Sequence, residues 1–229
     1  MDELPFDAVL CDFDGVVHLW DPDGMASLDR AWGLAEGSLA GAAFRPDLLE
    51  EAVTGQLSDG QWRERVAEDL ARDCGSGERA RGLVEAWSAL TGRVDTDVVR
   101  LLQTLRRRVP VVLVSNATTR LESCLAAHGL AESFDAVLNT ARVGVAKPDP
   151  RVFDLAARQV GADPGRCLFV DDTAGNVSAA RAAGMTALHY RRFGQLREAV
   201  APLLGRASFR YGAECGVAPD HRERAVTQP

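Results

Sequence analysis

Short apolar runs that end in polar or acidic residues are the feature that most constrains this chain. One stands near the start, and from residue 95 onward others alternate with segments of helical length. Such runs are typical of strands buried on both faces of a parallel sheet, where helices form the crossovers. The predicted strands cover residues 6–14, 109–116, 134–140, 166–172 and 186–190, and the predicted helices cover 95–108, 118–129, 150–161, 173–184 and 193–204. The pattern therefore predicts an α/β fold, a Rossmann-like doubly wound parallel sheet with helices on both faces.

Residues 17–93 interrupt this alternation. They contain no convincing strand, and their helical candidates cover residues 25–36, 46–54, 59–73 and 77–91. All four tryptophans fall in this segment, as expected of a small helical unit that needs large side chains to build a core. The predicted organisation is a catalytic core at 1–16 and 94–204, an inserted α-helical cap at 17–93, and a loosely ordered C-terminal tail at 205–229.

Composition excludes some partners. The formal net charge of −7 over 229 residues argues against nucleic acid or an anionic membrane as the partner, but leaves room for a small anionic substrate. Five dispersed cysteines without a CxxC pair, and an acidic N-terminus without a signal peptide, predict a cytoplasmic protein. No apolar stretch is long enough for a transmembrane helix. Nothing in the sequence indicates an oligomeric state.

Paired carboxylates follow two of the predicted strands. Asp12 and Asp14 end the first, and Asp171 and Asp172 end a later one. Aspartate often forms turns and helix caps, but two pairs placed directly after apolar strands exceed what that role explains. The carboxyl ends of parallel strands meet at one edge of a sheet, so four carboxylates would repel one another there. A hard divalent cation with oxygen ligands resolves this repulsion, and we expect Mg²⁺.

An anion site is predicted beside this cation site. Ser115 and Asn116 end the strand at 109–116 and precede a predicted helix, a position that suits an anion as well as a plain helix cap. Lys147 is the only lysine among 26 basic residues and stands before a Pro-Asp-Pro turn. Its ammonium group is a compact charge that would fit between Asp12 and a bound anion, where the planar guanidinium of an arginine would be too wide. A cation site next to an anion site favours phosphoryl transfer.

The motifs DFDGVV, SN, a lysine before PDP, and DDTAGN occur in the order of the four motifs of the haloacid dehalogenase-like hydrolase superfamily. The chain resembles the phosphatase-type members that carry a helical cap after the first motif, over roughly residues 6–204. The first motif lacks the threonine that many members have after the glycine. The fourth reads DDxxxN where many members have GDxxxD.

The resemblance implies a mechanism. Asp12 matches the nucleophile that forms an aspartyl-phosphate, and Asp14 matches the general acid and base. The metal ligands would be Asp12, the backbone carbonyl of Asp14 and Asp172. Asp171 would interact with the metal through a water molecule, or would contact the ligands without binding the metal itself.

The resemblance also implies a phosphate site. Ser115, Lys147 and the backbone amides near Gly15 and Asn116 would hold the phosphoryl oxygens. Asn176 would orient the lysine or a metal-bound water.

Substrate identity is less constrained. Near the predicted hinge, His18 and Trp20, together with Asp21 and Asp23, are candidates to face the substrate, although a role in the hinge or in a turn is the more common reason for such residues. The predicted function is Mg²⁺-dependent hydrolysis of a small phosphorylated metabolite. Asp14 argues against a dehalogenase, and the absence of a lysine in the cap argues against a phosphonate-cleaving enzyme. The alternatives are a sugar-phosphate mutase, a phospho-receiver-like signalling module and a catalytically inactive relative.

Overall fold

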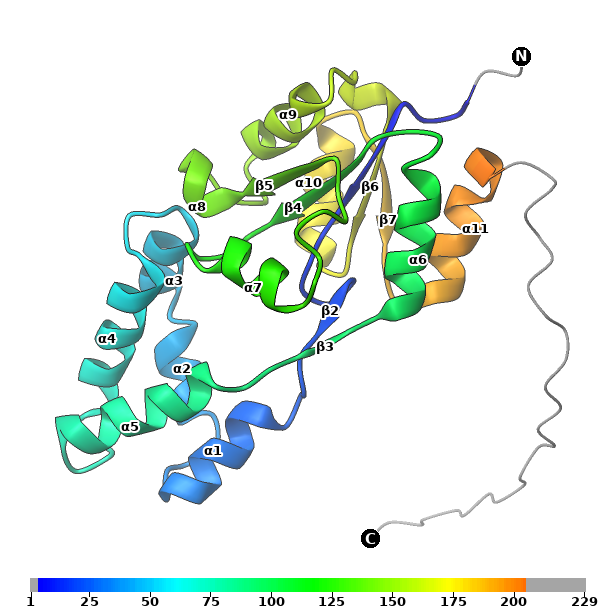
Figure 1. Ribbon diagram of the computed structural model, residues 1–229. Helices are drawn as coiled ribbons and strands as arrows, with labels where there is room; N and C mark the ends of the chain where they lie inside the picture. The colour runs from blue at the N-terminus through cyan, green and yellow to red at the C-terminus, as the bar shows by residue number, and fades with distance from the viewer. Residues whose placement is uncertain (1–3, 205–229) are drawn as a thin grey trace, which may run out of the picture.

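A five-stranded parallel sheet forms the centre of the molecule (Figure 1). The computed structural model describes residues 4–204. The strand order is β5–β4–β1–β6–β7, and all neighbouring strands run parallel. The strands are β1 (Ala8–Cys11), β4 (Val111–Ser115), β5 (Ala136–Asn139), β6 (Cys167–Asp171) and β7 (Thr186–His189). Since the chain builds outward from β1 to β5 and then continues on the other side of β1, the sheet is doubly wound, and the predicted α/β fold is confirmed.

Both faces of the sheet are covered by helices, because side chains alternate along each strand. Val9 and Cys11 of β1 belong to one apolar cluster, and Ala8 and Leu10 belong to the other. The first cluster contains residues from α6 (Thr96–Leu105), α7 (Leu121–Ala127) and α11 (Phe193–Leu204). The second contains residues from α9 (Pro150–Gln159) and α10 (Ala174–Ala182). Strands buried on both faces explain the uninterrupted apolar runs in the sequence.

Local sequence fixes where several of these helices begin. Asp95 caps α6 by accepting hydrogen bonds from the backbone amides of Asp97 and Val98. Asp149 caps α9 in the same way, and Pro150 occupies its first helical position, where the missing amide costs nothing. Two short elements, α8 (Thr140–Val143) and the 3₁₀ turn η1 (Pro164–Arg166), complete the core.

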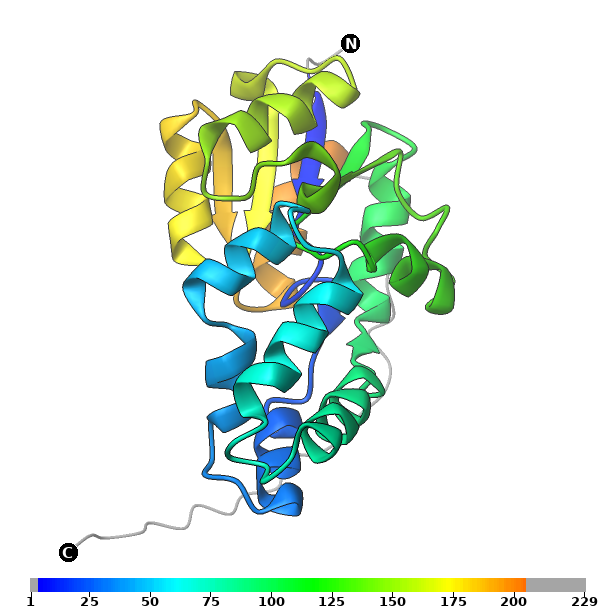
Figure 2. The same ribbon diagram turned by 90° about the vertical axis from the view of Figure 1, so that its left-hand side faces the viewer.

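Five helices between β1 and α6 form a helical module with its own apolar cluster. They are α1 (Gly24–Trp32), α2 (Ser38–Ala43), α3 (Pro46–Val53), α4 (Asp59–Leu70) and α5 (Gly77–Ser88). Two views show the module beyond the carboxyl ends of the strands (Figures 1 and 2). The predicted helix at 25–36 is wrong at its end, since Gly33 adopts φ +75° and stops α1. The unpredicted α2 follows because the buried Asp29 carboxylate accepts hydrogen bonds from the amides of Gly37 and Leu39.

A short ribbon links the module to the sheet. The strands β2 (His18–Leu19) and β3 (Arg93–Val94) pair antiparallel, where the chain leaves the core and returns to it. The expectation that residues 17–93 hold no strand is wrong at these two places, because two residues are too few to produce a recognisable period. The expected loose tail at 205–229 lies outside the described residues. Among the helices within residues 4–204, none is long and apolar enough to cross a membrane.

Candidate active site

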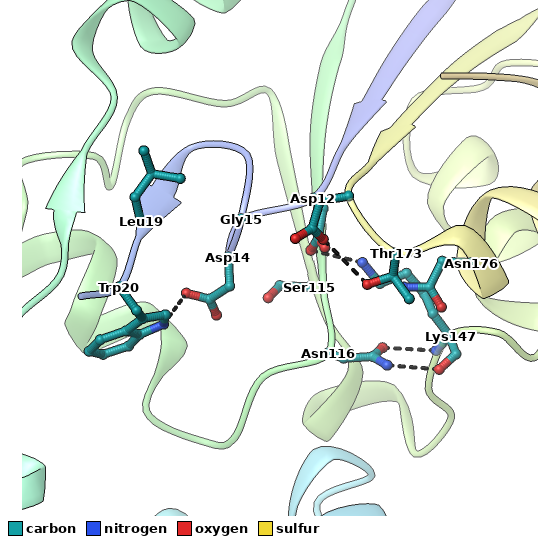
Figure 3. A pocket seen from close by; sticks show the side chains of 11 residues that line it. Asp12, Asp14, Gly15, Leu19, Trp20, Ser115, Asn116, Lys147, Thr173 and Asn176 are labelled. Atoms are coloured by element: carbon teal, nitrogen blue, oxygen red, sulfur yellow. Dashed lines mark hydrogen bonds and ion pairs between the residues drawn. The ribbon is translucent and has the colours of Figure 1, made fainter. Parts of the chain in front are cut away.

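The site lies where three adjacent strands end. Asp12 follows β1, Ser115 ends β4 and Asp171 ends β6, and these strands are neighbours in the sheet. The strand order reverses at β1, which is where open α/β sheets bind their ligands. An open pocket of about 640 Å³ occupies this edge (Figure 3). Its lining residues are Asp12, Asp14, Gly15, Leu19, Trp20, Ser115, Asn116, Lys147, Asp172, Thr173 and Asn176.

The Lys147 ammonium group has one acceptor for each of its three protons. Its Nζ lies 2.8 Å from Asp12 Oδ1, 2.7 Å from Asp171 Oδ2 and 2.9 Å from the carbonyl oxygen of Val114. The side chain is almost fully buried. A burial of this kind is tolerated because two carboxylates flank the charge and every donor is satisfied.

The backbone of Lys147 is held by Asn116. The Asn116 side chain donates to the Lys147 carbonyl oxygen at 2.7 Å and accepts from the Lys147 amide at 2.8 Å. The side-chain amide therefore positions the lysine, and only the backbone of Asn116 remains for the predicted role in binding an anion. The helix expected directly after this strand also differs, since α7 begins only at Leu121. Ser115 and Asn116 therefore do not stand at the N-terminus of α7, and anion binding at this strand end would rest on the Ser115 hydroxyl and the Asn116 backbone amide.

Asp171 binds the lysine, and Asn176 binds Asp171. Asp171 is fully buried, and its two oxygens accept from Lys147 Nζ, the Thr173 amide and Asn176 Nδ2. These contacts use both oxygens of the carboxylate. Of the predicted roles for Asn176, the structure favours orientation of the lysine, because its amide fixes the carboxylate to which the lysine binds.

Three carboxylates form the acidic cluster of the site. Asp12, Asp171 and Asp172 each offer an oxygen within 4.8 Å of the other two. Because Asp171 is committed to Lys147, Asp12 and Asp172 are the two that remain for a cation. In the described part of the chain, Asp12 Oδ1 contacts Lys147 and the Phe13 amide, and Oδ2 has no hydrogen-bond partner. This donor set suits a hard divalent ion with oxygen ligands.

Burial sets the electrostatics of the cluster. It raises the pKa of Asp12 to about 7, with Lys147 acting in the opposite direction and Asp171 reinforcing the rise. Burial alone would lower the pKa of Lys147, but the attraction of Asp12 and Asp171 outweighs it, and the pKa is raised. The lysine therefore carries its charge at neutral pH. The Asp12 carboxylate is poorly stabilised in the absence of a further cation.

Gly15 brings Asp172 close to the first motif. Its φ is +83°, and a Cβ atom at this position would lie 2.0 Å from Asp172 Oδ2. Any other residue would push the carboxylate away, so glycine is required both by the conformation and by the space. The Gly15 amide donates to the His18 carbonyl oxygen at 2.8 Å. It is thus used in the turn, in place of the role in phosphate binding expected for an amide at this motif.

Asp14 lies apart from the acidic cluster. Its carboxylate points along the other side of the pocket, toward Trp20 (Figure 3). His18 Nδ1 and Trp20 Nε1 both lie 2.8 Å from Asp14 Oδ1. His18 is fully buried and does not line the pocket, so the expectation that it faces the substrate is wrong. Trp20 is 52% exposed and does line the pocket.

Comparison with known proteins adds to this geometry. A sequence model of the haloacid dehalogenase-like hydrolases matches residues 6–184, which is most of the chain. The chain belongs to this family. The hydrolase class predicted from the four motifs is therefore confirmed.

Individual relatives of this haloacid dehalogenase-like hydrolase agree with the phosphatase-type resemblance. A protein named as a phosphatase from Mycobacterium tuberculosis is 30% identical over 213 residues, which cover 86% of this chain and 93% of the relative. A phosphoserine phosphatase of Thermus thermophilus is 35% identical over 135 residues, which cover 56% of this chain and 54% of that protein. A family enzyme from Bacteroides thetaiotaomicron, solved with magnesium and inorganic phosphate, has a TM-score of 0.67 and 19% identity over 83% of this chain and 98% of its own. At this identity the last comparison concerns the fold alone.

The helical module of this haloacid dehalogenase-like hydrolase contacts the loop that follows β4. Asp59, at the start of α4, accepts from the Thr118 hydroxyl at 2.8 Å, and its amide donates to the Thr119 hydroxyl at 3.0 Å. Asp59 also pairs with Arg63. The candidates Asp21 and Asp23 lie in the turn before α1, where Asp21 accepts from the Asp23 amide, and neither lines the pocket.

Some lining residues were not predicted. Thr173 and Leu19 are both adjacent to predicted site residues, so proximity to a motif could have found them. The Val114 carbonyl that accepts from Lys147 could not be found in this way, since every residue carries such a group.

Proposed function

We propose that this hydrolase is a Mg²⁺-dependent phosphatase that cleaves a small phosphorylated metabolite through an aspartyl-phosphate on Asp12. One observation carries the proposal. Among the described residues, no side chain or amide hydrogen-bonds to Asp12 Oδ2 beside the buried Lys147, while a second, separate carboxylate, Asp14, lines the same pocket. A nucleophile on one side and a proton donor on the other is what in-line displacement requires. The relatives named as phosphatases support the same reaction class.

Asp12 Oδ2 attacks phosphorus, and the bond to the leaving oxygen breaks. Asp14 donates a proton to that oxygen and later takes one from the water that hydrolyses the aspartyl-phosphate. Lys147 offsets the repulsion between the Asp12 carboxylate and the phosphate, because its ammonium group lies 2.8 Å from Asp12 Oδ1.

Asp12 and Asp172 are the side chains that would hold Mg²⁺, together with the backbone carbonyl of Asp14 that the family resemblance implies. The bound ion would supply positive charge against the negative charge of the nucleophile and the phosphate. Asp171 supports Lys147 instead, since both its oxygens already accept hydrogen bonds from protein groups.

Ser115 is the first candidate to bind the phosphoryl oxygens. Its side chain is buried at the pocket, and its hydroxyl makes no hydrogen bond within residues 4–204. The backbone amide of Asn116 is the second candidate. On the leaving-group side the pocket presents Leu19 and Trp20. Lys147 is the only cationic residue among the lining residues, which suits a substrate with a single phosphate group. A cytoplasmic location remains a prediction from the sequence.

The decisive experiment measures phosphate release from para-nitrophenyl phosphate, with Mg²⁺ and then with EDTA. Turnover should require the metal and should vanish in Asp12→Asn. Asp97→Asn, an exposed substitution on α6, is the matched control and should behave as the wild type. Equal turnover in EDTA, or in Asp12→Asn, would refute the mechanism.

A panel of phosphorylated metabolites then identifies the substrate by phosphate release. A sugar-phosphate mutase would convert one isomer into another with little free phosphate. A receiver-like module would retain phosphate on Asp12 without turnover.

A further inference from the structure

We propose that His18 and Trp20 form a two-donor clamp on Asp14, which fixes one carboxylate oxygen so that the other transfers the proton. The proposal rests on the proposed function, in which Asp14 is the general acid and base. His18 and Trp20 then act as positioning residues.

The two donors meet on a single oxygen. His18 Nδ1 and Trp20 Nε1 each lie 2.8 Å from Asp14 Oδ1. The indole nitrogen can only donate, and the imidazole must carry its proton on Nδ1 to donate to a carboxylate. No hydrogen bond in the described part of the chain uses Asp14 Oδ2, and the Asp14 side chain lines the pocket. The geometry thus leaves Oδ2 as the oxygen that can meet a substrate.

The imidazole of His18 is itself held firmly. It stacks on Phe13 with ring centroids 5.0 Å apart, and meets the edge of Trp20 at 4.6 Å. Gly92 lies against its other end, where a Cβ atom would come within 2.4 Å of His18 Nε2. Nε2 is buried without a hydrogen-bond partner among the described residues. Within residues 4–204, the ring's side-chain hydrogen bond is therefore the one to Asp14, and the His128 ring lies beside it with centroids 5.1 Å apart.

The backbone closes the same turn. The Phe13 carbonyl oxygen accepts from the Val17 and His18 amides at 2.9 Å, and the Gly15 amide donates to the His18 carbonyl oxygen. His18 also pairs with Val94 in the ribbon that links the helical module to the core. The clamp is thus built into the connection between the two parts of the molecule.

Fixing the carboxylate has a catalytic consequence. The terminal torsion of an aspartate is broad and twofold, so an unrestrained Asp14 would present either oxygen over a range of angles. Two donors on Oδ1 remove that freedom before the substrate arrives. A pre-oriented acid helps most when the leaving group is a poor one, because proton transfer then contributes most to the transition state.

A set of variants distinguishes the loss of a hydrogen-bond donor to Asp14 from the loss of side-chain packing. Trp20→Phe deletes the indole N–H and keeps an aromatic ring, and His18→Leu deletes the imidazole donor with a similar volume. His18→Asn restores an N–H donor close to the position of Nδ1. Asp14→Ala gives the effect of losing the acid. Trp32→Phe makes the same change as Trp20→Phe at a tryptophan that does not line the pocket.

The assay measures kcat/KM for aryl phosphates whose leaving groups range from acidic nitrophenols to unsubstituted phenol. This parameter reports the phosphoryl transfer step. We expect His18→Leu and Trp20→Phe to lose about 10–100-fold with phenyl phosphate and less than about threefold with the most acidic leaving group, with KM little changed. We expect His18→Asn to recover most of the loss, and Trp32→Phe to match the wild type.

Two results would overturn the clamp. One is an equal loss in His18→Leu and Trp20→Phe across all leaving groups, and the other is no loss with phenyl phosphate in either variant. Failure of the proposed function is distinguishable, because the wild type would then show no metal-dependent turnover, or Asp14→Ala would retain the wild-type leaving-group dependence.

Discussion

Replacing Asp12 by asparagine should make the metal-free protein more stable relative to the wild type as the pH rises. Burial raises the pKa of Asp12 from its ordinary value of 3.8 to about 7. The folded protein therefore binds this proton more tightly than the unfolded chain does. The contribution of Asp12 to stability is fully present below about pH 4 and is lost as the pH rises through 7. Asparagine does not titrate, so the variant escapes this loss.

The size of the effect follows from the two pKa values. Each pKa unit corresponds to about 1.4 kcal/mol. The interval between 3.8 and about 7 therefore limits the loss in the wild type's free energy of unfolding at high pH to about 4 kcal/mol. Part of the loss is already present at pH 5. The stability of Asp12→Asn relative to the wild type should thus rise by up to about 3 kcal/mol between pH 5 and pH 8. For a chain of this size, the Tm of the variant minus that of the wild type should therefore rise by about 5–10 °C from pH 5 to pH 8.

Thermal unfolding of the two proteins in EDTA, at pH 5 and at pH 8, measures this difference. Other titrating groups are common to both proteins and cancel in the comparison. Mg²⁺ at pH 8 should raise the Tm of the wild type more than that of the variant, because the ion binds the ionised carboxylate. A difference in Tm between Asp12→Asn and the wild type that is the same at both pH values, or that favours the variant more at pH 5, would refute the argument. Asp97→Asn, the exposed replacement on α6, is measured alongside as the control.

Further predictions concern the groups around this carboxylate. Lys147→Arg should lose most activity and about 1–3 kcal/mol of stability in urea unfolding, because a larger group must enter a filled site; near-normal turnover would contradict this. Asp171→Ala should cost about 3–5 kcal/mol in the same measurement, since it removes a buried partner of the lysine. Gly15→Ala should lower the apparent Mg²⁺ affinity in a titration of activity at least tenfold, because its Cβ would displace Asp172; an unchanged affinity would argue against Asp172 as a ligand.

Much of the fold could be predicted from the sequence, because the strands and helices of the core have recognisable local sequence patterns. Apolar runs, capping aspartates and the order of the four motifs located the sheet and its functional edge. The short elements escaped prediction. The strands β2 and β3 have two residues each, and α2 depends on a buried Asp29 whose hydrogen bonds reach eight and ten residues along the chain.

For the site, the sequence by itself determined which chemical groups gather at the edge of the sheet. A lone lysine, paired aspartates and a serine at strand ends were sufficient for that. Only the tertiary structure decided what each group contacts: Asp171 binds Lys147, Asn116 holds the lysine backbone, and His18 turns inward to Asp14. The physical reason is that most of these partners lie far apart in the chain, and a buried polar group must take whichever partner the packing brings within hydrogen-bond distance.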